Sequence, residues 1–583
     1  MCYIRFILYV VTNFKLGESN LVGYDVKRRT VFAAAALSLC AISAPVLAQV
    51  VPTPGAVQEQ IRRQPTMPVT PGDAGFARPA PATATSGIAA GGRQIPINKF
   101  DITGNSVISA QELQSVVSPF EGRALSLFEI YEVADVLTQY YRDSGYSVAS
   151  VTVPEQKISS GTVKLEVIEG RIGALSVDGN KAYRHGFLRR HVTGAAVGDV
   201  ISEQRLERDL LLLNDLPGLQ ANAVVEPGSV FGESNLTVKT KEKRIDAAMR
   251  FNNYGRTSIG EWKIEGDFAL NAPLGVGDQL VFNIAHADGG KLDYFNFGYS
   301  APILFSGTRA AAYFSRNDYN VDSDELPPGL ESLDISGDGD NFGFNISHPF
   351  IRSRKENLYI GIGYDRVITR QRIGGLGLKD KADISLMNLN LLYSRVHLDN
   401  SFSTVSANFA TNFDSNQRDP VTLAPGNNAQ TAKMRVDMTH LRTIVGAWSL
   451  FGKLTMVGSV DPIVDTQKYR IGGRDSVRGY ASSELAGDGG YAATIEIQRQ
   501  LMFADKWPTR AFIFGDTGTV TRKNAATIGL DSSESISGAG VGLESLVGQH
   551  YRVNLELAKQ IGSQESTDGR DGVRVWFGLT ANF

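Results

Sequence analysis

The chain has 583 residues, a formal net charge of −3 and 20% charged residues. It is therefore too long for one compact domain and lacks the basic surface that nucleic acid would need. Its mean hydropathy is −0.12, and no segment after residue 50 contains the roughly 18 uninterrupted apolar residues of a membrane-spanning helix. This excludes a multi-helix membrane protein but not a membrane β-barrel, in which every second strand residue is polar. The cysteines, Cys2 and Cys40, both lie in a segment that we expect to be removed, so the mature chain suits an oxidising compartment.

Residues 1–48 are predicted to be an export signal. Basic residues at Lys27–Arg29 precede an apolar run from Val31 to Leu47, and small residues precede a cleavage position after Ala48. A single membrane anchor is the alternative, but the apolar run is short and no stop-transfer flank follows it. Residues 1–26 lie upstream of a signal of ordinary length, and we expect them to result from a start codon assigned too early.

Residues 49–95 are rich in Pro, Ala, Gly and Thr, which is the composition of a linker. Within this Pro-rich linker, Ala56–Gln64 is predicted to form a short N-terminal helix. So short a helix is marginal alone in water. It therefore needs a cavity or a partner to stabilise it.

Residues 96–170 and 171–243 repeat one order of elements: strand, helix, helix, strand, strand. Each copy has a turn after its first strand, Gly104-Asn105 and Gly179-Asn180. The second helix of the first copy begins at Ser126 and has a glutamate three positions later, which is capping-box spacing. We therefore expect two βααββ domains, in each of which helices cover a three-stranded sheet that leaves an open edge.

From residue 244 to 583, short alternating segments are separated by Gly, Asp, Asn and Ser turns. Polar and apolar residues alternate in Tyr551–Leu557, and Val573–Phe583 has its apolar residues on one face. Side chains alternate faces along a strand, so each segment has one apolar and one polar surface. A water-soluble sandwich shows the same alternation, but the length and C-terminal position of the block and the preceding export signal favour a transmembrane β-barrel.

Sixteen strands are predicted in this block. Hydrocarbon cannot satisfy unpaired backbone groups, so the sheet must close on itself, and a barrel of about 16 strands encloses water. The predicted ranges are 247–254, 258–270, 279–287, 291–301, 308–317, 340–349, 357–368, 382–395, 401–411, 429–443, 446–459, 490–500, 509–519, 535–545, 549–558 and 572–583.

Two short motifs lie near the end of the block. The first is Val477-Arg478-Gly479-Tyr480, in a long loop between two predicted strands, and the second is Phe514-Gly515-Asp516-Thr517-Gly518, on the strand 509–519. Asp516 shares a strand face with Phe512, Phe514 and Gly518. A carboxylate cannot reasonably face lipid, so this face is predicted to line the lumen.

The order of export signal, linker, two βααββ units and about 16 strands, together with these motifs, resembles the TpsB transporters of two-partner secretion (FhaC/ShlB type, BamA superfamily). The βααββ units resemble POTRA domains, and Asn252–Gly255 and Pro273–Asp278 resemble the start of the family's barrel. The resemblance implies that the loop folds into the lumen and that Arg478 pairs with Asp516 on the inner wall. The alternative is an ordinary loop arginine in water. In a wet lumen the pair would add little stability and would mainly hold the loop in position.

The resemblance also implies a function: export of one large TpsA-type exoprotein across the outer membrane of a Gram-negative bacterium. Periplasmic POTRA-like domains would bind the unfolded partner by adding it to a sheet edge, and the candidate edge contains Ser147, Val148, Val151 and Val153. No nucleotide site is predicted, so folding of the partner outside the cell would drive transport. In relatives an N-terminal helix plugs the lumen; for Ala56–Gln64, a plug and a plain linker are both open.

The terminal Phe583 has two compatible interpretations, as the last lipid-facing residue and as the aromatic end that the outer-membrane assembly machinery recognises in the family. The sequence contains no enzyme motif, and Gly538–Gly542 is a Gly-rich strand without the following helix of a phosphate loop. We therefore predict no catalysis, cofactor or metal, and no required oligomer. The rival interpretation is an insertase of the BamA superfamily, which usually carries more βααββ units. A passive porin has no use for two periplasmic domains.

Overall fold

The computed structural model describes residues 53–61, 76–77, 92–158, 160–326, 330–412, 432–523, 525–528, 530–570 and 572–583. The predicted export signal, the upstream residues 1–26 and most of the linker lie outside these residues. Within the described part of the chain, no helix is both long enough and apolar enough to cross a membrane.

The first βααββ domain has a three-stranded sheet in the order β3-β6-β5 and a small β2-β4 pair. The apolar stripe of its long helix is buried against the sheet, and the predicted capping box of Ser126 and Glu129 is formed. The elements are β2 Ile95–Ile97, β3 Lys99–Thr103, α5 Ala110–Val117, η1 Ser118–Phe120, β4 Arg123–Leu125, α6 Leu127–Asp143, β5 Ser150–Thr152 and β6 Thr162–Ile168.

The second domain repeats this order, and its sheet gains a fourth, very short strand from the linker. The strand order is β1-β8-β9-β7. Its core is made by leucines of the second helix and apolar residues of the sheet. The elements are β1 Phe76–Ala77, β7 Arg171–Asp178, α7 His185–His191, α8 Glu203–Asn214, β8 Leu219–Pro227 and β9 Glu233–Glu242.

The Gly-Asn turns of the two domains are built alike. In each turn the asparagine amide, of Asn105 or Asn180, donates to the carbonyl oxygen three residues later at 2.9 Å. A glutamate near the end of the domain, Glu169 or Glu242, accepts the backbone N–H groups that follow the turn. Both turn glycines have φ of +86°, which favours glycine. The repeat seen in the sequence is therefore also a repeat of hydrogen bonds.

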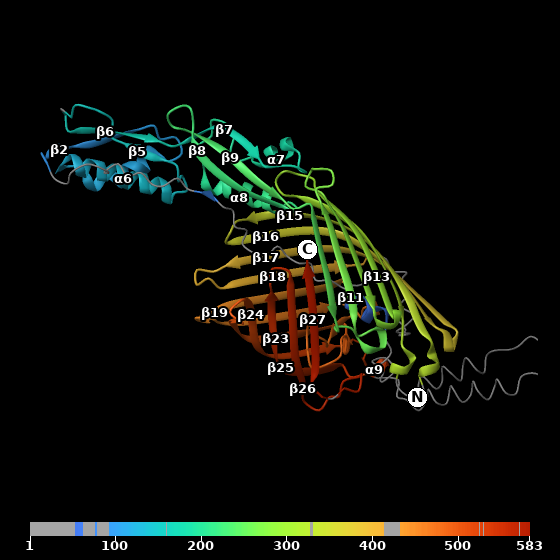
Figure 1. The fold of residues 1–583 in the computed structure, drawn as a ribbon. Coiled ribbons are helices and arrows are strands. Elements are labelled where there is room, and N and C mark those ends of the chain that lie inside the picture. Colours follow the sequence, from blue (N-terminus) through green and yellow to red (C-terminus); the bar gives the residue numbers. More distant parts are fainter. Residues whose placement is uncertain are drawn as a thin grey trace, which may run out of the picture. The chain divides into compact units, whose positions relative to one another are not determined.

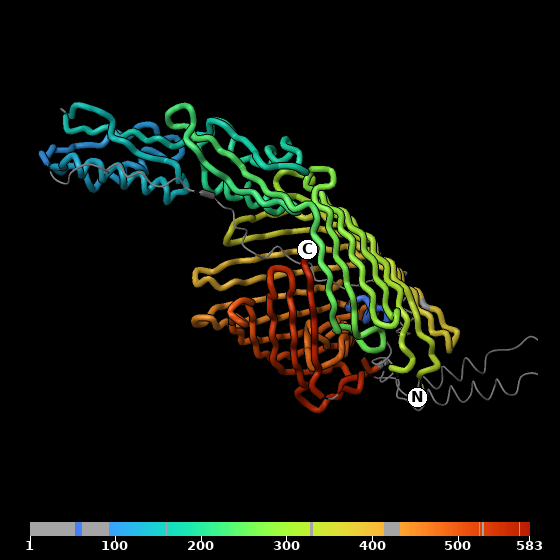
Figure 2. Tube along the Cα trace, viewed as in Figure 1, coloured from blue at the N-terminus to red at the C-terminus, as the bar shows by residue number. Residues whose placement is uncertain are grey.

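The C-terminal block is a closed barrel of sixteen strands, β10 to β20 followed by β23 to β27 (Figures 1 and 2). Every neighbouring pair is antiparallel, and β10 pairs with β27 to close the ring. The fold class and strand number predicted from the sequence are confirmed. The strands are β10 Ile245–Asn252, β11 Lys263–Asn271, β12 Gln279–Ala287, β13 Leu292–Pro302, β14 Arg309–Asn320, β15 Ile335–Arg352, β16 Glu356–Ile373, β17 Leu378–Val396, β18 Phe402–Thr411, β19 Ala432–Val445, β20 Trp448–Ser459, β23 Gly489–Phe503, β24 Trp507–Thr521, β25 Ser533–Val547, β26 Tyr551–Ile561 and β27 Arg574–Asn582.

The apolar face of the barrel points outward and the polar face inward. On β23, Ile495 and Ile497 are 62% and 40% exposed, whereas Glu496 between them is 6% exposed. A soluble β-protein buries its apolar face, so this polarity is that of a barrel with lipid outside. The predicted strand 258–270 begins only at Lys263, because Thr257–Ile259 forms a 3₁₀ turn.

Candidate functional site

The long loop between β20 and β23 lies against the inner wall of the barrel. It contains η7 Asp465–Gln467 and a small hairpin of β21 Tyr469–Ile471 and β22 Leu485–Gly487. Apolar loop residues, among them Ile471, Val477 and Tyr480, form one buried cluster with Val520 and Ile536 of the wall. This packing holds the hairpin and the Val477–Tyr480 motif inside the lumen.

Arg478 and Asp516, which the sequence analysis paired, are in direct contact. The guanidinium Nε and Nη2 each donate to one oxygen of the carboxylate at 2.8 Å, which is a bidentate pair. The Arg478 backbone N–H donates to the same carboxylate at 3.2 Å, and Thr494 Oγ1 donates to it at 2.9 Å. The side chain and the backbone of the motif are thus both held by one residue of β24.

The structure adds two carboxylates that the sequence analysis did not include. Arg478 Nη1 donates to Glu496 on β23 at 2.9 Å and to Glu556 on β26 at 3.3 Å. Strand alternation places both glutamates on the lumen face of predicted strands, so this signal was present in the sequence. What the sequence lacks is the register between neighbouring strands and the position of the loop, which together bring both residues to the same arginine.

The guanidinium also lies over an aromatic ring. Arg478 Cζ is 3.3 Å from the centroid of Phe514, whose face carries negative charge density. The ring fits because the facing residue on β25 is a glycine: a Cβ on Gly540 would lie 2.5 Å from the Phe514 ring. The Gly-rich segment Gly538–Gly542 therefore makes room for the site.

The other motif residues have distinct surroundings. Gly479 approaches β26 so closely that a Cβ would lie 2.9 Å from the backbone nitrogen of Gln560. The Tyr480 hydroxyl donates to the carbonyl oxygen of Gln564 at 3.2 Å. A Cβ on Gly518 would crowd the loop's Ile471, whereas a Cβ on Gly515 would meet open space. Gly515 therefore makes no packing contribution to this site.

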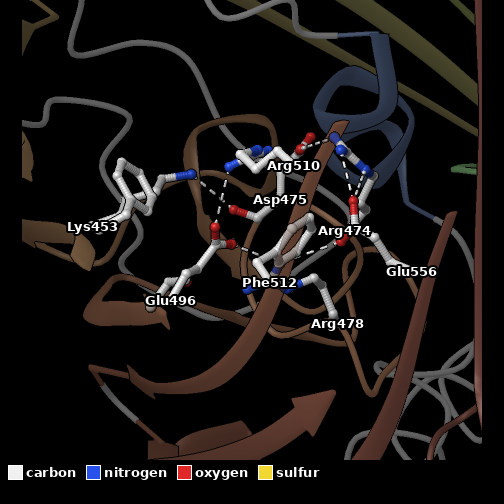
Figure 3. Close-up of a pocket in the computed structure, with 10 residues that line it drawn as sticks. Lys453, Arg474, Asp475, Arg478, Glu496, Arg510, Phe512 and Glu556 are labelled. Atoms are coloured by element: carbon white, nitrogen blue, oxygen red, sulfur yellow. Dashed lines mark hydrogen bonds and ion pairs between the residues drawn. The ribbon is translucent and has the colours of Figure 1, made fainter. Parts of the chain in front are cut away.

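A charged cavity of about 220 Å³ lies beside Arg478 (Figure 3). Arg474 donates to Glu556 at 2.9 Å, and Arg510 donates to Glu496 at 3.4 Å, so each glutamate serves two arginines. Lys453 and Asp475 complete the charged lining. Within the described residues, no group of three or more His, Cys, Asp or Glu has the arrangement of a metal site.

The Arg478–Asp516 pair is predicted from the sequence to lie in a wet lumen, whereas the structure buries both side chains. Arg478 is 5% exposed and Asp516 is 4% exposed. The hairpin, the aromatic rings and the wall leave little of either side chain accessible to water. A buried charge that loses its partner is costly, so the pair is required once the loop is in place.

The predicted N-terminal helix is present as α4 Pro54–Ile61; predicted residues after Ile61 lie outside the described chain. Its Gly55 N–H donates to Asp465 of the lumen loop at 2.9 Å. Val57 is fully buried among barrel residues that include Leu292 and Tyr319. Helix α4 therefore contacts both the lumen loop and the barrel.

The terminal Phe583 is 61% exposed. Its N–H donates to Ala247 on β10 at 2.9 Å, and its carbonyl oxygen accepts from Lys243 at 2.9 Å. These contacts fasten the chain end at the junction of first and last strands. They leave the aromatic ring of Phe583 available to lipid. Recognition of Phe583 by the assembly machinery stays a prediction.

The predicted binding edge of the first domain needs correction. Strand β5 covers only Ser150–Thr152, so Ser147 and Val148 are not strand residues. Val148 packs against the core of the second domain, and Val151 is buried in the core of the first. Val153 lies just beyond the strand and is partly buried. The three valines Val148, Val151 and Val153 therefore pack in two cores and do not form one continuous edge.

Comparison with known proteins is consistent with this architecture. The family model of haemolysin secretion/activation protein ShlB/FhaC/HecB matches residues 232–545, more than half of the chain, and a ShlB-type POTRA model matches residues 95–170. The heme/hemopexin transporter protein HuxB of Haemophilus influenzae is 22% identical over 490 residues, which is 82% of this chain and 85% of that protein.

Two solved structures share the fold. CdiB from Escherichia coli superposes with a TM-score of 0.68 at 17% identity, covering 97% of this chain and all of that chain. BamA from Haemophilus ducreyi, lacking POTRA domains 1–3, superposes with a TM-score of 0.52 at 16% identity, covering 84% of this chain and all of that chain. With the barrel, the POTRA domain and the family match in agreement, this chain belongs to the haemolysin secretion/activation protein family ShlB/FhaC/HecB.

Proposed function

We propose that the protein binds one unfolded exoprotein of the TpsA type in the periplasm and passes it through the barrel lumen to the cell surface. The family is one of two-partner secretion transporters, and the barrel lies in the outer membrane with the POTRA domains in the periplasm. The observation that carries the proposal is the content of the lumen. A loop and a short helix pack against its wall, and neither contributes a strand to the barrel's ring of strand pairs.

The lumen loop and helix α4 together define a closed resting state. The loop is held by Arg478, and α4 is held by the loop through Asp465 and by the wall through Val57. Passage of a polypeptide requires both to move. The charged cavity beside Arg478 offers water and alternative partners to the carboxylates during that movement. We propose that α4 acts as a plug.

Transport by this mechanism needs no catalysis. The charged residues of the site hold each other in ion pairs, and the family is one of transporters. We therefore propose that the protein is not an enzyme, uses no nucleotide, and depends on folding of the exported chain outside the cell to prevent its return.

A comparison of secreted proteins tests the function. Deletion of the gene is expected to remove one large exoprotein from the culture medium while the set of outer-membrane proteins stays intact. A plasmid copy of the gene in the deletion strain is expected to restore the exoprotein. Loss of many outer-membrane proteins, with normal release of exoproteins, would instead identify an insertase and overturn the proposal.

A further inference from the structure

The outward face of the barrel carries an exposed arginine that no carboxylate of the described chain neutralises. Arg499 on β23 shares this face with Ile495 and Ile497, because side chains alternate along a strand. Within the described residues, its guanidinium makes no ion pair within 4.0 Å and no hydrogen bond. The nearby Arg442 and Arg510, by contrast, are paired with carboxylates. The N–H donors of Arg499 are therefore available to an anion from outside the chain.

The ring of Trp448 fixes the position of this cation. Arg499 Cζ is 5.1 Å from the centroid of the Trp448 ring, which is cation–π distance. The two residues are opposite each other in the pairing of β20 with β23. The N–H of Gln500 donates to the carbonyl oxygen of Ala447 at 2.9 Å, so the pair lies next to the turn between β19 and β20. A guanidinium held on an aromatic face is preorganised for bidentate binding of phosphate.

The rim that carries Arg499 is the periplasmic one. Strand β10 begins at the second periplasmic domain and the strands alternate in direction, so the turns β19–β20 and β23–β24 lie on the periplasmic side. Aromatic residues mark the same level: Phe503 stacks on Trp507 with ring centroids 6.0 Å apart, and Tyr551 is 48% exposed. Such aromatic girdles lie at the headgroup level of a membrane. Arg499 therefore lies at the depth of the phosphates of the periplasmic leaflet.

An apolar groove of about 470 Å³ leads from Arg499 toward the middle of the membrane. It is hollow where the small Ala511 on β24 stands between Arg499 on β23 and Leu543 on β25. Longer aliphatic side chains form the next row of the groove, deeper in the membrane: Ile497, Ile513, Val541 and Leu557. A cation at the rim followed by an aliphatic channel has the order of groups of a phospholipid, phosphate first and acyl chain below it.

We propose that this groove is a binding site for one glycerophospholipid of the periplasmic leaflet, with its phosphate on Arg499 and an acyl chain over Ala511. The phosphate complements the unpaired cation, and the acyl chain complements the aliphatic walls. An arginine that only extends into water needs neither the contact with Trp448 nor a groove beside it. The inference concerns the outer surface of the barrel and does not depend on the proposed export function.

The phosphate contact is tested by native mass spectrometry of the full chain as purified from the outer membrane, with added dioleoyl phosphatidylglycerol. Wild type is expected to retain one lipid. Arg499→Gln is expected to lower the retained fraction about tenfold, because the charge-assisted hydrogen bonds to phosphate are lost. The matched control is Arg442→Gln, which removes an exposed arginine of the neighbouring hairpin whose partner is Asp399 at 3.4 Å. This control should retain lipid as wild type does. Equal retention by wild type and Arg499→Gln would overturn the proposal.

The groove is tested with phosphatidylglycerol that carries a photoreactive diazirine in its acyl chain. Labelling is expected on β23, β24 and β25 around Ala511. Ala511→Phe fills the groove and should lose this labelling, whereas Ala539→Phe, on the same outward face of β25 but outside the groove, should keep it. Heat-modifiable mobility checks that each variant is folded.

A diacylglycerol with the same photoreactive chain separates phosphate recognition from simple contact with hydrocarbon. It is expected to label these strands much less than phosphatidylglycerol does. Equal labelling by the two lipids would show that any hydrocarbon fills the groove and would overturn the role of Arg499. Undiminished labelling of folded Ala511→Phe would overturn the groove as the site.

Discussion

The indole Nε1 of Trp576 donates a 2.9 Å hydrogen bond to the carbonyl oxygen of Arg478. The last barrel strand thus holds the backbone of the motif, while β23, β24 and β26 hold its guanidinium. Trp576 also packs with Phe512 and Phe514 in one buried cluster. Four strands near the end of the chain therefore bind the loop. The contacts that hold the loop can form only after these strands have folded.

Replacing Arg478 with alanine should leave a folded, inserted barrel and reduce export. Three buried carboxylates, Asp516, Glu496 and Glu556, would lose a shared cation, and breaking a buried pair costs about 3–5 kcal/mol. The loop is expected to dissociate from the inner wall, while the strand pairs of the barrel remain. Export is measured as exoprotein in the medium, and folding as heat-modifiable mobility of the membrane fraction. Normal export at normal membrane abundance would contradict the role of Arg478.

The matched control for Arg478 is Arg366→Ala. Arg366 makes an equally bidentate pair with Asp383, at 2.9 Å for both contacts, but its side chain is about half exposed. Such a pair is worth roughly 0.2–1 kcal/mol. Export and abundance should both stay near wild type. A loss equal to that of Arg478→Ala would show that any missing arginine disturbs the barrel.

Two glycines test the packing around Phe514. Gly540→Val is expected to disturb both the β25–β26 pairing and the Phe514 ring, because a Cβ at this position would lie 2.0 Å from the carbonyl oxygen of Leu557 and 2.5 Å from the ring, and overpacking costs about 1–3 kcal/mol or more. The barrel should unfold at lower temperature and export should fall. Gly515→Ala, on the outward face, meets no atom within 4 Å and should be silent. Thermal unfolding of the purified protein, followed by gel mobility, separates these outcomes.

The second domain is joined to the barrel by a partly buried ion pair. Arg352 on β15 donates to both oxygens of Asp215 at 2.8 and 2.7 Å, and the Tyr359 hydroxyl donates to the same carboxylate at 3.3 Å. Asp215→Ala leaves Arg352 buried without this partner, a loss of about 3–5 kcal/mol. We expect faster protease cleavage near residue 243 and a broader distance distribution between spin labels on the domain and the barrel.

The control for the joint is Asp318→Ala, which removes an exposed pair with Arg316 elsewhere on the barrel. It should change neither the cleavage rate nor the label distances. If Asp215→Ala behaves like this control, the contact does not hold the domain.

Acidification should destabilise the second domain, and with it the same joint, through His191. This imidazole lies against Phe187 and Phe305, and its Nε2 has no hydrogen-bond partner among the described residues. Burial lowers the pKa of His191 below its ordinary value. The unfolded state therefore binds more protons, so stability is full above about pH 6.5 and is lost as the pH falls through the lowered pKa.

The measurement is thermal unfolding of the second domain between pH 7.5 and 5. His191→Gln should flatten the profile relative to wild type. Burial raises the pKa of Asp209 in the same domain, which acts in the opposite direction and is unchanged by this substitution. Identical pH profiles for wild type and His191→Gln would contradict the assignment.

Strand alternation was sufficient to predict the number of barrel strands and the lumen face of Asp516, because lipid and water impose the period of two on every strand. Strand alternation underestimated the length of β15, which spans 18 residues. The start of β15 contains Asp338 and Asp340, whose Gly/Asp-rich surroundings are typical of turns. In the barrel these carboxylates pair with Arg370 on β16, so cross-strand charge compensates for a poor local strand signal.

Other features could not be predicted because they depend on contacts between distant segments. The partners Glu496 and Glu556 are set by the register of neighbouring strands and by the position of the loop. Ser147 and Val148 were assigned to an edge because their local pattern resembles a strand, but the interface between two domains determines their position. The strand Phe76–Ala77 has two residues and no periodicity to detect.

The pairing of β10 with β27 has a practical consequence for work on this protein. All five of its residue pairs, from Ala248 with Asn582 to Asn252 with Gly578, use the last few residues of the chain. A deletion of six residues, or an affinity tag fused after Phe583, acts at the one joint that turns a curved sheet into a ring. Purification handles therefore belong in an extracellular turn or after the predicted cleavage position, and C-terminal fusions should be checked first for ring closure.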